Sequence, residues 1–175
     1  YDGAKIRIHS SPRIKKSERK ELKAGLEDLV RPVPNGSFLG IKVKLLLYNM
    51  AGKPKGKGLG KWIREHLGEP PVLASYSVME KTRAVLQNRL ENRGYFKDTV
   101  ALDTTYKGRK IRARYTASIG YQYRIRNVVY PNAPDSLSQQ IRSMAKRSRL
   151  KKGAPYNLET IKEERTRIDT RLKQR

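Results

Sequence analysis

Two stretches of the chain, 82 positions apart, share one pattern of charged and apolar residues. The matching positions are Arg83, Leu86, Arg89, Leu90 and Arg93 in the first stretch and Arg165, Ile168, Arg171, Leu172 and Arg175 in the second. Self-similarity at a fixed offset is typical of tandem copies of one supersecondary unit. The first stretch continues into Gly94-Tyr95-Phe96, whereas the second stretch reaches Arg175 without this turn. We therefore expect two copies of one unit in a piece of a larger protein, the second copy lacking its last strands.

The chain carries a net charge of +24, from 40 Lys and Arg against 16 Asp and Glu. A charge of this size predicts a polyanionic partner, either nucleic acid or an anionic membrane surface, and does not choose between them. Cysteine is absent, which excludes disulfides and thiolate chemistry. No apolar run approaches the ~20 residues that a membrane-spanning helix needs.

The first part of the chain predicts one strand and several helices. Residues 5–9 alternate polar and apolar side chains, the period of a half-buried strand, and residues 16–30 carry leucines at helical spacing. Residues 38–50 are apolar and fit either a strand or a buried helix, so both structures stay open. A short amphipathic helix is expected at residues 62–67.

The clearest helix is predicted directly before Gly94. Ser77 and Glu80 form the sequence pattern of a capping box, in which each side chain satisfies a backbone amide at the start of the helix. Leu86 and Leu90 share one face of this helix. Gly94 is expected to end it in the left-handed conformation, which glycine adopts without strain.

A β-hairpin is predicted after this helix. Residues 95–106 form its first strand, and Lys107-Gly108 turns the chain. In the return strand, alternation predicts a buried face of Ile111, Ala113, Tyr115 and Ala117 and an outer face of Lys110, Arg112, Arg114 and Thr116. The hairpin therefore has one wet, basic side.

A second set of elements is expected after Gly120. It begins with a strand at residues 123–130. A helix follows with one apolar stripe, formed by Leu137, Ile141, Met144 and Ala145. The last helix is capped by Asn157 and carries Leu158, Ile161, Ile168 and Leu172.

The predicted fold class is α+β: a three-stranded mixed sheet backed by two helices in the order β-α-α-β-β. A second unit of this kind follows and is truncated after its second helix.

This order of elements resembles the POTRA domain, the periplasmic repeat that precedes outer-membrane β-barrels of the BamA/TamA superfamily. The resemblance is carried by the helix at residues 83–93, the turn Gly94-Tyr95-Phe96, the hairpin ending near Gly120 and the re-entry at residues 123–128.

The resemblance also implies domain limits. Residues 1–120 form the first POTRA-like unit, with a long insert at about residues 30–76 that a minimal POTRA domain lacks, and residues 121–175 form the second. Residues 34–40 and 68–72 look most similar to the TamL branch, a lipoprotein-type relative of TamA.

The function that the resemblance implies is a periplasmic module of outer-membrane protein assembly and translocation. In the full-length protein the module would be tethered to the outer membrane, with a membrane barrel C-terminal to this chain. Its expected partners are outer-membrane protein clients and a TamB-like partner subunit, and an anionic lipid surface is a further one. In such a protein the repeats also dock onto one another and onto partner subunits.

An unpaired sheet edge is the expected client site, because an extended client can join it as another strand through backbone hydrogen bonds. In the family this edge strand follows the Gly-Tyr-Phe turn. The corresponding residues here are Thr99, Val100, Ala101, Leu102 and Asp103. We expect proline at Val100 or Leu102 to weaken client binding, because proline removes a backbone donor.

Basic side chains form two further candidate sites. The first comprises Arg112, Arg114, Arg124 and Arg126. Their alternation favours either a solvent face protected by charge or a docking face for an anionic partner.

The second is a glycine-rich loop with Lys53, Lys55, Lys57 and Lys61. This loop lacks the spacing and hydroxyl of a phosphate-binding loop, which favours a solvated loop or contact with lipid headgroups.

No catalytic, cofactor or metal site is predicted. His9 and His66 are the two histidines, and zinc-protease and nucleophile-elbow motifs are missing. We therefore expect a binding module rather than an enzyme.

Gly94, Tyr95 and Phe96 are interpreted as a structural turn, with the aromatic rings between helix and sheet.

The alternative function is a basic RNA-binding or ribosomal-type protein, which the pI of about 10.5 favours. RNA-binding signatures are missing, and two Phe and one Trp offer few rings on which bases could stack. No nucleic acid partner is therefore expected.

Overall fold

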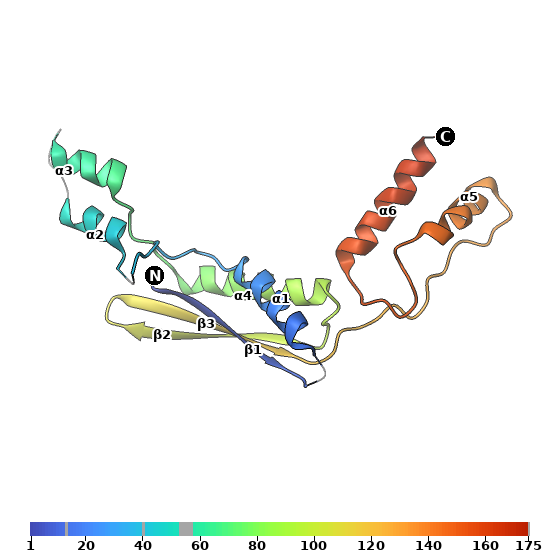
Figure 1. Ribbon diagram of the computed structural model, residues 1–175, viewed down its shortest axis with the longest axis horizontal. Coiled ribbons are helices and arrows are strands. Elements are labelled where there is room, and N and C mark those ends of the chain that lie inside the picture. Colours follow the sequence, from blue (N-terminus) through green and yellow to red (C-terminus); the bar gives the residue numbers. More distant parts are fainter. Residues whose placement is uncertain (13, 40, 53–57, 175) are drawn as a thin grey trace.

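The computed structural model describes residues 1–12, 14–39, 41–52 and 58–174. The protein is of the predicted α+β class, with six α-helices and one three-stranded mixed sheet among these residues. Figure 1 shows the sheet in the middle of the molecule, with helical segments projecting beyond both of its ends.

The sheet is built from β1 (Gly3–Ser10), β2 (Thr99–Lys107) and β3 (Lys110–Ile119), in the order β1-β3-β2. β2 and β3 form the predicted antiparallel hairpin, which turns at Gly108 with a φ of 56°. β1 pairs with β3 in parallel, so the strand predicted near the start of the chain is confirmed. β3 is therefore central, and β1 and β2 are the two edges.

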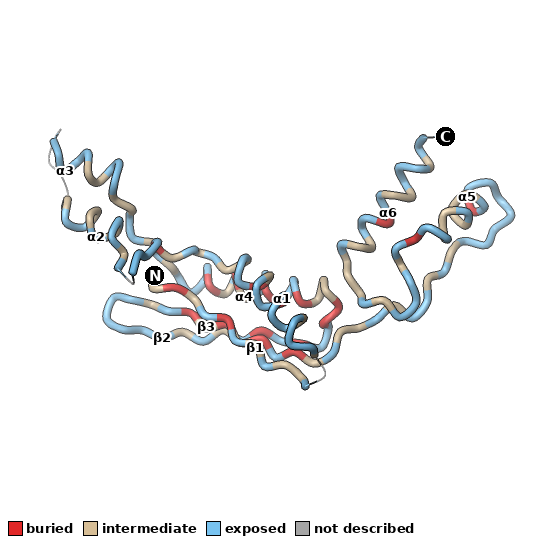
Figure 2. Tube along the Cα trace, in the orientation of Figure 1, coloured by how far each residue is buried: buried red, intermediate tan, exposed pale blue. Residues whose placement is uncertain are grey.

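Two helices, α1 (Lys16–Glu27) and α4 (Tyr76–Asn92), lie along one face of the sheet (Figure 1). The apolar stripes of these helices and the inward side chains of the strands form one core. Its buried members are Ile6, Leu22, Leu26, Met79, Leu86, Leu90, Tyr95, Val100, Ala113, Tyr115, Ala117 and Ile119. The buried apolar residues among those described thus all belong to this β-α-α-β-β unit (Figure 2).

The start of α4 differs from the prediction. Ser75 is the N-cap, and its Oγ accepts a hydrogen bond from the backbone N–H of Val78 at 3.4 Å. The predicted capping box is wrong, because Ser77 already lies in the first turn. Glu80 does not cap the helix; its carboxylate accepts from Arg83 Nε at 2.7 Å, a charge-assisted bond. The predicted end is confirmed, since Gly94 has a φ of +85°.

The insert between α1 and α4 contains α2 (Val43–Met50), α3 (Leu59–Trp62) and a π-helical turn, η1 (Ile63–Leu67). The open choice for residues 38–50 is thus decided in favour of a helix at 43–50, and the predicted short helix at 62–67 is present. We call α2, α3 and η1 the helical arm. It projects beyond the hairpin end of the sheet, and none of its described residues is fully buried (Figures 1 and 2).

The part after β3 contains α5 (Ser136–Met144), a 3-10 turn, η2 (Ala145–Arg147), and α6 (Leu158–Lys173). The strand predicted at residues 123–130 is wrong, because a strand needs a ladder partner and only an isolated bridge between Arg124 and Pro155 forms there among the described residues. The predicted cap of the last helix is confirmed: Asn157 Oδ1 accepts from the N–H of Glu159 at 2.9 Å.

Candidate functional site

β2 is an edge strand, and its helix-facing side chains anchor it in the core. Val100 is buried and Leu102 is half-buried, whereas Thr99, Ala101 and Asp103 are exposed on the opposite face of the sheet. The five residues of the predicted client edge therefore lie along one strand at the rim of the sheet. Whether a client can pair there depends on which backbone groups point outward.

The outward groups follow from one hydrogen bond. The N–H of Val100 donates to Gln87 Oε1 at 2.9 Å, so it points away from β3. Backbone groups alternate sides along a regular strand, and the register of β2 on β3 is uninterrupted. Leu102, Thr104 and Tyr106 therefore also turn their N–H and C=O groups outward.

Gln87, on α4, closes the first part of this edge. Its Nε2 donates to the carbonyl of Asp98 at 2.8 Å while its Oε1 accepts from Val100, so the side-chain amide takes the place of a neighbouring strand. A second bond from Nε2, to Glu91 Oε1 at 3.0 Å, fixes the orientation of the amide. The expectation for proline at Val100 is thereby corrected, because this donor already has a partner inside the molecule.

The remaining outward groups belong to Leu102, Thr104 and Tyr106, which we call the open edge. Among the described residues, no hydrogen bond occupies the outward backbone groups of these three. Exposed unpaired N–H and C=O groups in an extended row are a template for another strand. The open edge thus begins two residues further along β2 than the Gln87 contact.

The four arginines of the predicted docking face do not share one surface. Arg112 and Arg114 are on the open face of β3, where Arg112 pairs with Asp2 and Arg114 pairs with Asp103 at 3.3 Å. Arg124 lies beyond the sheet, and its guanidinium donates to the carbonyl of Gly153 at 2.8 Å. Arg126, in the same extended segment, is exposed.

The basic loop is described in part only. Lys53, Lys55 and Lys57 lie outside the described residues. Lys61 is in α3 and approaches Glu65, one helical turn on, with an N–O distance of 3.8 Å. An exposed pair at this spacing contributes only a few tenths of a kcal/mol, about 0.3–0.5.

The turn after α4 joins two parts of the molecule. Tyr95 packs in the core as predicted, and its hydroxyl donates to Glu18 Oε1 at 2.8 Å. Burial, reinforced by the Glu18 carboxylate, raises the pKa of Tyr95 above its usual value, so the phenol stays a donor. Phe96 is not between helix and sheet: its ring meets Tyr123 and Tyr156 edge-on, with centroid distances of 5.3 and 4.9 Å.

Backbone contacts complete this junction between the sheet unit and the following segment. The N–H of Tyr123 donates to the carbonyl of Gly94 at 2.8 Å, and Gln122 Nε2 donates to that of Arg93 at 2.7 Å. A Cβ on Gly94 would lie 2.9 Å from Cβ of Tyr156. Gly94 therefore serves both the left-handed turn and the close approach of the later segment.

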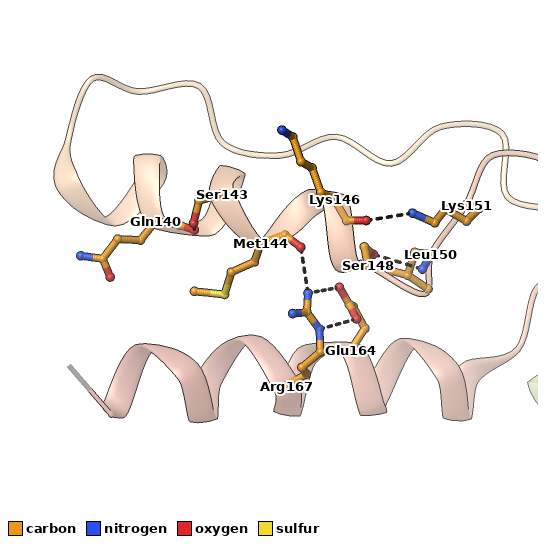
Figure 3. Close-up of polar contacts among 9 residues, drawn as sticks. All are labelled: Gln140, Ser143, Met144, Lys146, Ser148, Leu150, Lys151, Glu164 and Arg167. Carbon is orange, nitrogen blue, oxygen red and sulfur yellow. Dashed lines mark hydrogen bonds and ion pairs between the residues drawn. The ribbon is translucent and has the colours of Figure 1, made fainter.

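α5 and α6 are held together by a polar clamp (Figure 3). Glu164 is only 3% exposed and accepts from Arg167 Nε and Nη2 at 2.9 and 2.8 Å. Arg167 Nη2 also donates to the carbonyl of Met144 at 3.2 Å, which connects α6 to the end of α5. Hydrogen bonds from Arg167 lower the pKa of Glu164 to about 2.

Sequence reasoning missed Gln87 and Glu164. No pattern singles out Gln87, because its contact depends on how closely α4 approaches β2. For Glu164 a signal exists: it lies on the apolar face of the last helix, and Arg167, three residues on, is within reach on the same helix.

Two further findings concern metal binding and membrane-spanning helices. Within the described residues, no cluster of three or more His, Asp or Glu side chains could hold a metal ion. None of the helices formed by these residues combines the length and the apolar character needed to cross a bilayer.

No family model matches the chain, and no curated protein is significantly similar to it. Among solved structures, the chain is similar to POTRA1-3 of the periplasmic domain of Omp85 from Anabaena, with 9% sequence identity and a TM-score of 0.41. The similarity covers 98% of this chain and 50% of that chain, so the chain spans about half the length of that structure. At 9% identity, no residue role is transferred from that protein.

Proposed function

We propose that the chain is the periplasmic POTRA region of an outer-membrane β-barrel assembly protein and that it binds extended client segments by β-augmentation. Residues 1–120 and 121–175 then act as two consecutive units. The TamL branch, the tether to the outer membrane and a TamB-like partner subunit belong to the same proposal. The binding role requires no catalytic group.

The observation that carries the proposal is the open edge. Leu102, Thr104 and Tyr106 offer outward backbone groups on a strand that the core holds in place through Val100. Such an edge binds through the main chain and therefore accepts clients of differing sequence. Clients of a barrel-assembly protein share extended segments of about ten alternating residues, which are the form that the edge would bind.

Proline at Thr104 is the sharpest test. Its outward N–H has no partner within the described residues, so Thr104→Pro removes a donor without breaking the ladder to β3. A peptide of about ten alternating aromatic and polar residues is the client probe, and fluorescence anisotropy reports its binding. We expect about tenfold weaker binding for Thr104→Pro, because one hydrogen bond is lost and the ring obstructs the added strand.

The matched control is Thr104→Val, which keeps the N–H and the branched side chain. Wild-type affinity is expected for this variant. Equal affinity of the proline and valine variants, both with native circular dichroism, would exclude binding through the open edge.

RNA binding remains the second candidate function, because the net charge of +24 favours any polyanion. A gel shift with single-stranded RNA at about 150 mM salt tests it. Retained RNA binding at this salt, together with no peptide binding, would favour the second candidate over the first.

A further inference from the structure

The helical arm carries exposed apolar side chains at helical spacing. On α2, Val43, Leu46 and Met50 follow one another at i, i+3 and i+7, and Met50 is 74% exposed. On the second half of the arm, Leu59 and Trp62 repeat the spacing and are 74% and 50% exposed. Each half of the arm thus presents a partly exposed apolar stripe, and in the second half the Trp62 ring stacks on His66 with centroids 5.4 Å apart.

The two halves are held to each other by a polar seam rather than by these stripes. The guanidinium of Arg64 lies over the ring of Tyr48, 4.0 Å from its centroid, and also donates to the Tyr48 hydroxyl at 2.5 Å. A Cβ on Gly68 would lie 2.9 Å from Cα of Tyr48, so glycine permits this close approach. The exposed apolar side chains are therefore not the ones that hold the two halves of the arm together.

The chain segments before and after the arm are joined to each other at its base, and the base is tied to the N-terminal end of the chain, directly before β1. The buried Asn35 donates from Nδ2 to the carbonyl of Pro70 at 2.8 Å and accepts from the N–H of Val72 at 3.0 Å. Lys42 adds an ion pair with Asp2 at 3.5 Å. The arm therefore projects from the rest of the protein at a position that these contacts fix.

Positive charge flanks the stripes. The described charged side chains of the arm and the residue before it are Lys42, Lys44, Lys61, Arg64 and Glu65, of which Glu65 alone is acidic. The core of a protein–protein interface is depleted in lysine. Apolar stripes with Trp and Leu beside lysines are instead the pattern of helices that lie in the interface of an anionic bilayer.

We propose that the helical arm docks on an anionic lipid bilayer, with the stripes of α2 and α3 inserted at the level of the headgroups and the flanking lysines on the lipid phosphates. The arm then holds the sheet unit close to the membrane surface. This role is separate from the open edge, which is on β2.

Trp62 reports on this docking directly, because it is the single tryptophan of the chain. The full chain is mixed with vesicles of phosphatidylcholine containing ~30% phosphatidylglycerol and with vesicles of phosphatidylcholine alone. With the anionic vesicles we expect Trp62 emission to move to shorter wavelengths and to become protected from acrylamide. An unchanged spectrum, or equal binding to both vesicle types, would overturn the proposal.

Two pairs of variants separate the apolar and the charged contributions. Leu46→Gln with Met50→Gln is expected to lower the partition coefficient about tenfold or more, whereas Val85→Gln with Leu137→Gln, at exposed apolar positions elsewhere, leaves it unchanged. Lys44→Gln with Lys61→Gln is also expected to lower it about tenfold.

The control for the charged pair is Lys16→Gln with Lys20→Gln on α1, which removes the same charge away from the arm. Equal losses for the arm and α1 pairs would show that net charge alone drives binding and would overturn the proposal. A Trp62 shift that depends on protein concentration without vesicles would assign the stripes to a second copy of the chain and would also overturn it.

Discussion

α4 and α6 carry the same residue pattern at an offset of 82 positions and lie in different surroundings. Their first residues, Tyr76 and Leu158, are 82 positions apart, and so are their N-caps, Ser75 and Asn157. The offset of 82 therefore extends to the caps, and in both helices a polar side chain accepts a hydrogen bond from a backbone N–H of the first turn. What differs is the surface on which each helix lies.

The same apolar stripe is buried in one helix and half-exposed in the other. Met79, Leu86 and Leu90 of α4 correspond to Ile161, Ile168 and Leu172 of α6. The first three are at most 1% exposed beneath the sheet, while the second three are all half-buried. The repeated pattern thus specifies a helix with an apolar face. Contact with the sheet determines whether this face is fully buried, as it is in α4.

One position of the stripe is polar in both copies and serves different neighbours. Thr82 Oγ1 donates to the carbonyl of Arg31 at 2.7 Å, at the start of the insert. Its counterpart Glu164 binds Arg167, which contacts the end of α5. Among the described residues the sheet packs against α1 and α4 and not against α6, which a charged clamp holds to α5 instead.

The largest expected contrast is between two large-to-small substitutions at matching positions. Leu86→Ala should reduce the free energy of unfolding by about 3 kcal/mol, because it leaves a cavity in the core. Ile168→Ala should cost less than about 1 kcal/mol, because the side chain is already half in water. Urea unfolding followed by circular dichroism measures both, and equal costs would mean that the α6 stripe is covered in solution.

The clamp of α6 gives the next contrast. Glu164→Gln should destabilise the α5–α6 packing by about 2 kcal/mol, because it leaves Arg167 with a weaker partner, and hydrogen exchange of the α5 amides measures this. Thr82→Val, the matching change in α4, should cost about 1 kcal/mol. Similar exchange of α5 in Glu164→Gln and wild type would contradict the clamp.

The same clamp predicts a pH dependence. The pKa of Glu164 is lowered from 4.5 to about 2, so its contribution is present above the ordinary value and is lost as the pH falls through about 2. Protection of α5 should therefore decline between these two pH values in wild type and not in Glu164→Gln. A parallel decline in both proteins would assign the acid sensitivity to other carboxylates.

Gly94 tests the end of α4. Gly94→Ala should cost about 2 kcal/mol, because the left-handed backbone and the contact with Tyr156 both oppose a Cβ. Gly153→Ala is the control, since its φ of +82° is similar but a Cβ there meets nothing within 4 Å. The control should cost about 1 kcal/mol, and NMR contacts between Phe96 and Tyr156 should be lost only in Gly94→Ala.

The smallest contrast lies at the caps. Asn157→Ala should cost about 1 kcal/mol and Ser75→Ala about 0.5, because the Ser75 bond is longer, at 3.4 Å against 2.9 Å. Thermal unfolding of the two variants measures the difference. The reverse order would show that the packing of α4 makes its start depend more on the cap.

The parts of the fold with strong local patterns could be predicted from the sequence. The alternation of Ala113, Tyr115 and Ala117 placed the central strand correctly, because each inward side chain meets the core at a period of two. Gly94 and Asn157 were identified because their roles at helix ends are set by local chemistry. These features need no knowledge of distant residues.

The parts that failed depend on partners far along the chain. Residues 123–130 have a strand pattern, yet a strand forms only where another backbone can complete its hydrogen bonds. The sequence predicts a free edge at Val100, because nothing local reveals that Gln87 reaches it from another element. The hydrogen bond from Val100 to Gln87, rather than the position of β2 in the sheet, determines where the open edge begins.

The parallel pairing of β1 with β3 has a consequence for synthesis. Gly3 meets Arg112 and Ser10 meets Ile119, so more than a hundred residues separate each pair. A chain made from its N-terminus exposes β1 unpaired until the return strand has emerged, and contacts of such high separation form slowly. The helical arm, whose contacts are more local, can form before the sheet closes, so β1 rather than the arm is the segment that stays unpaired in a newly made chain.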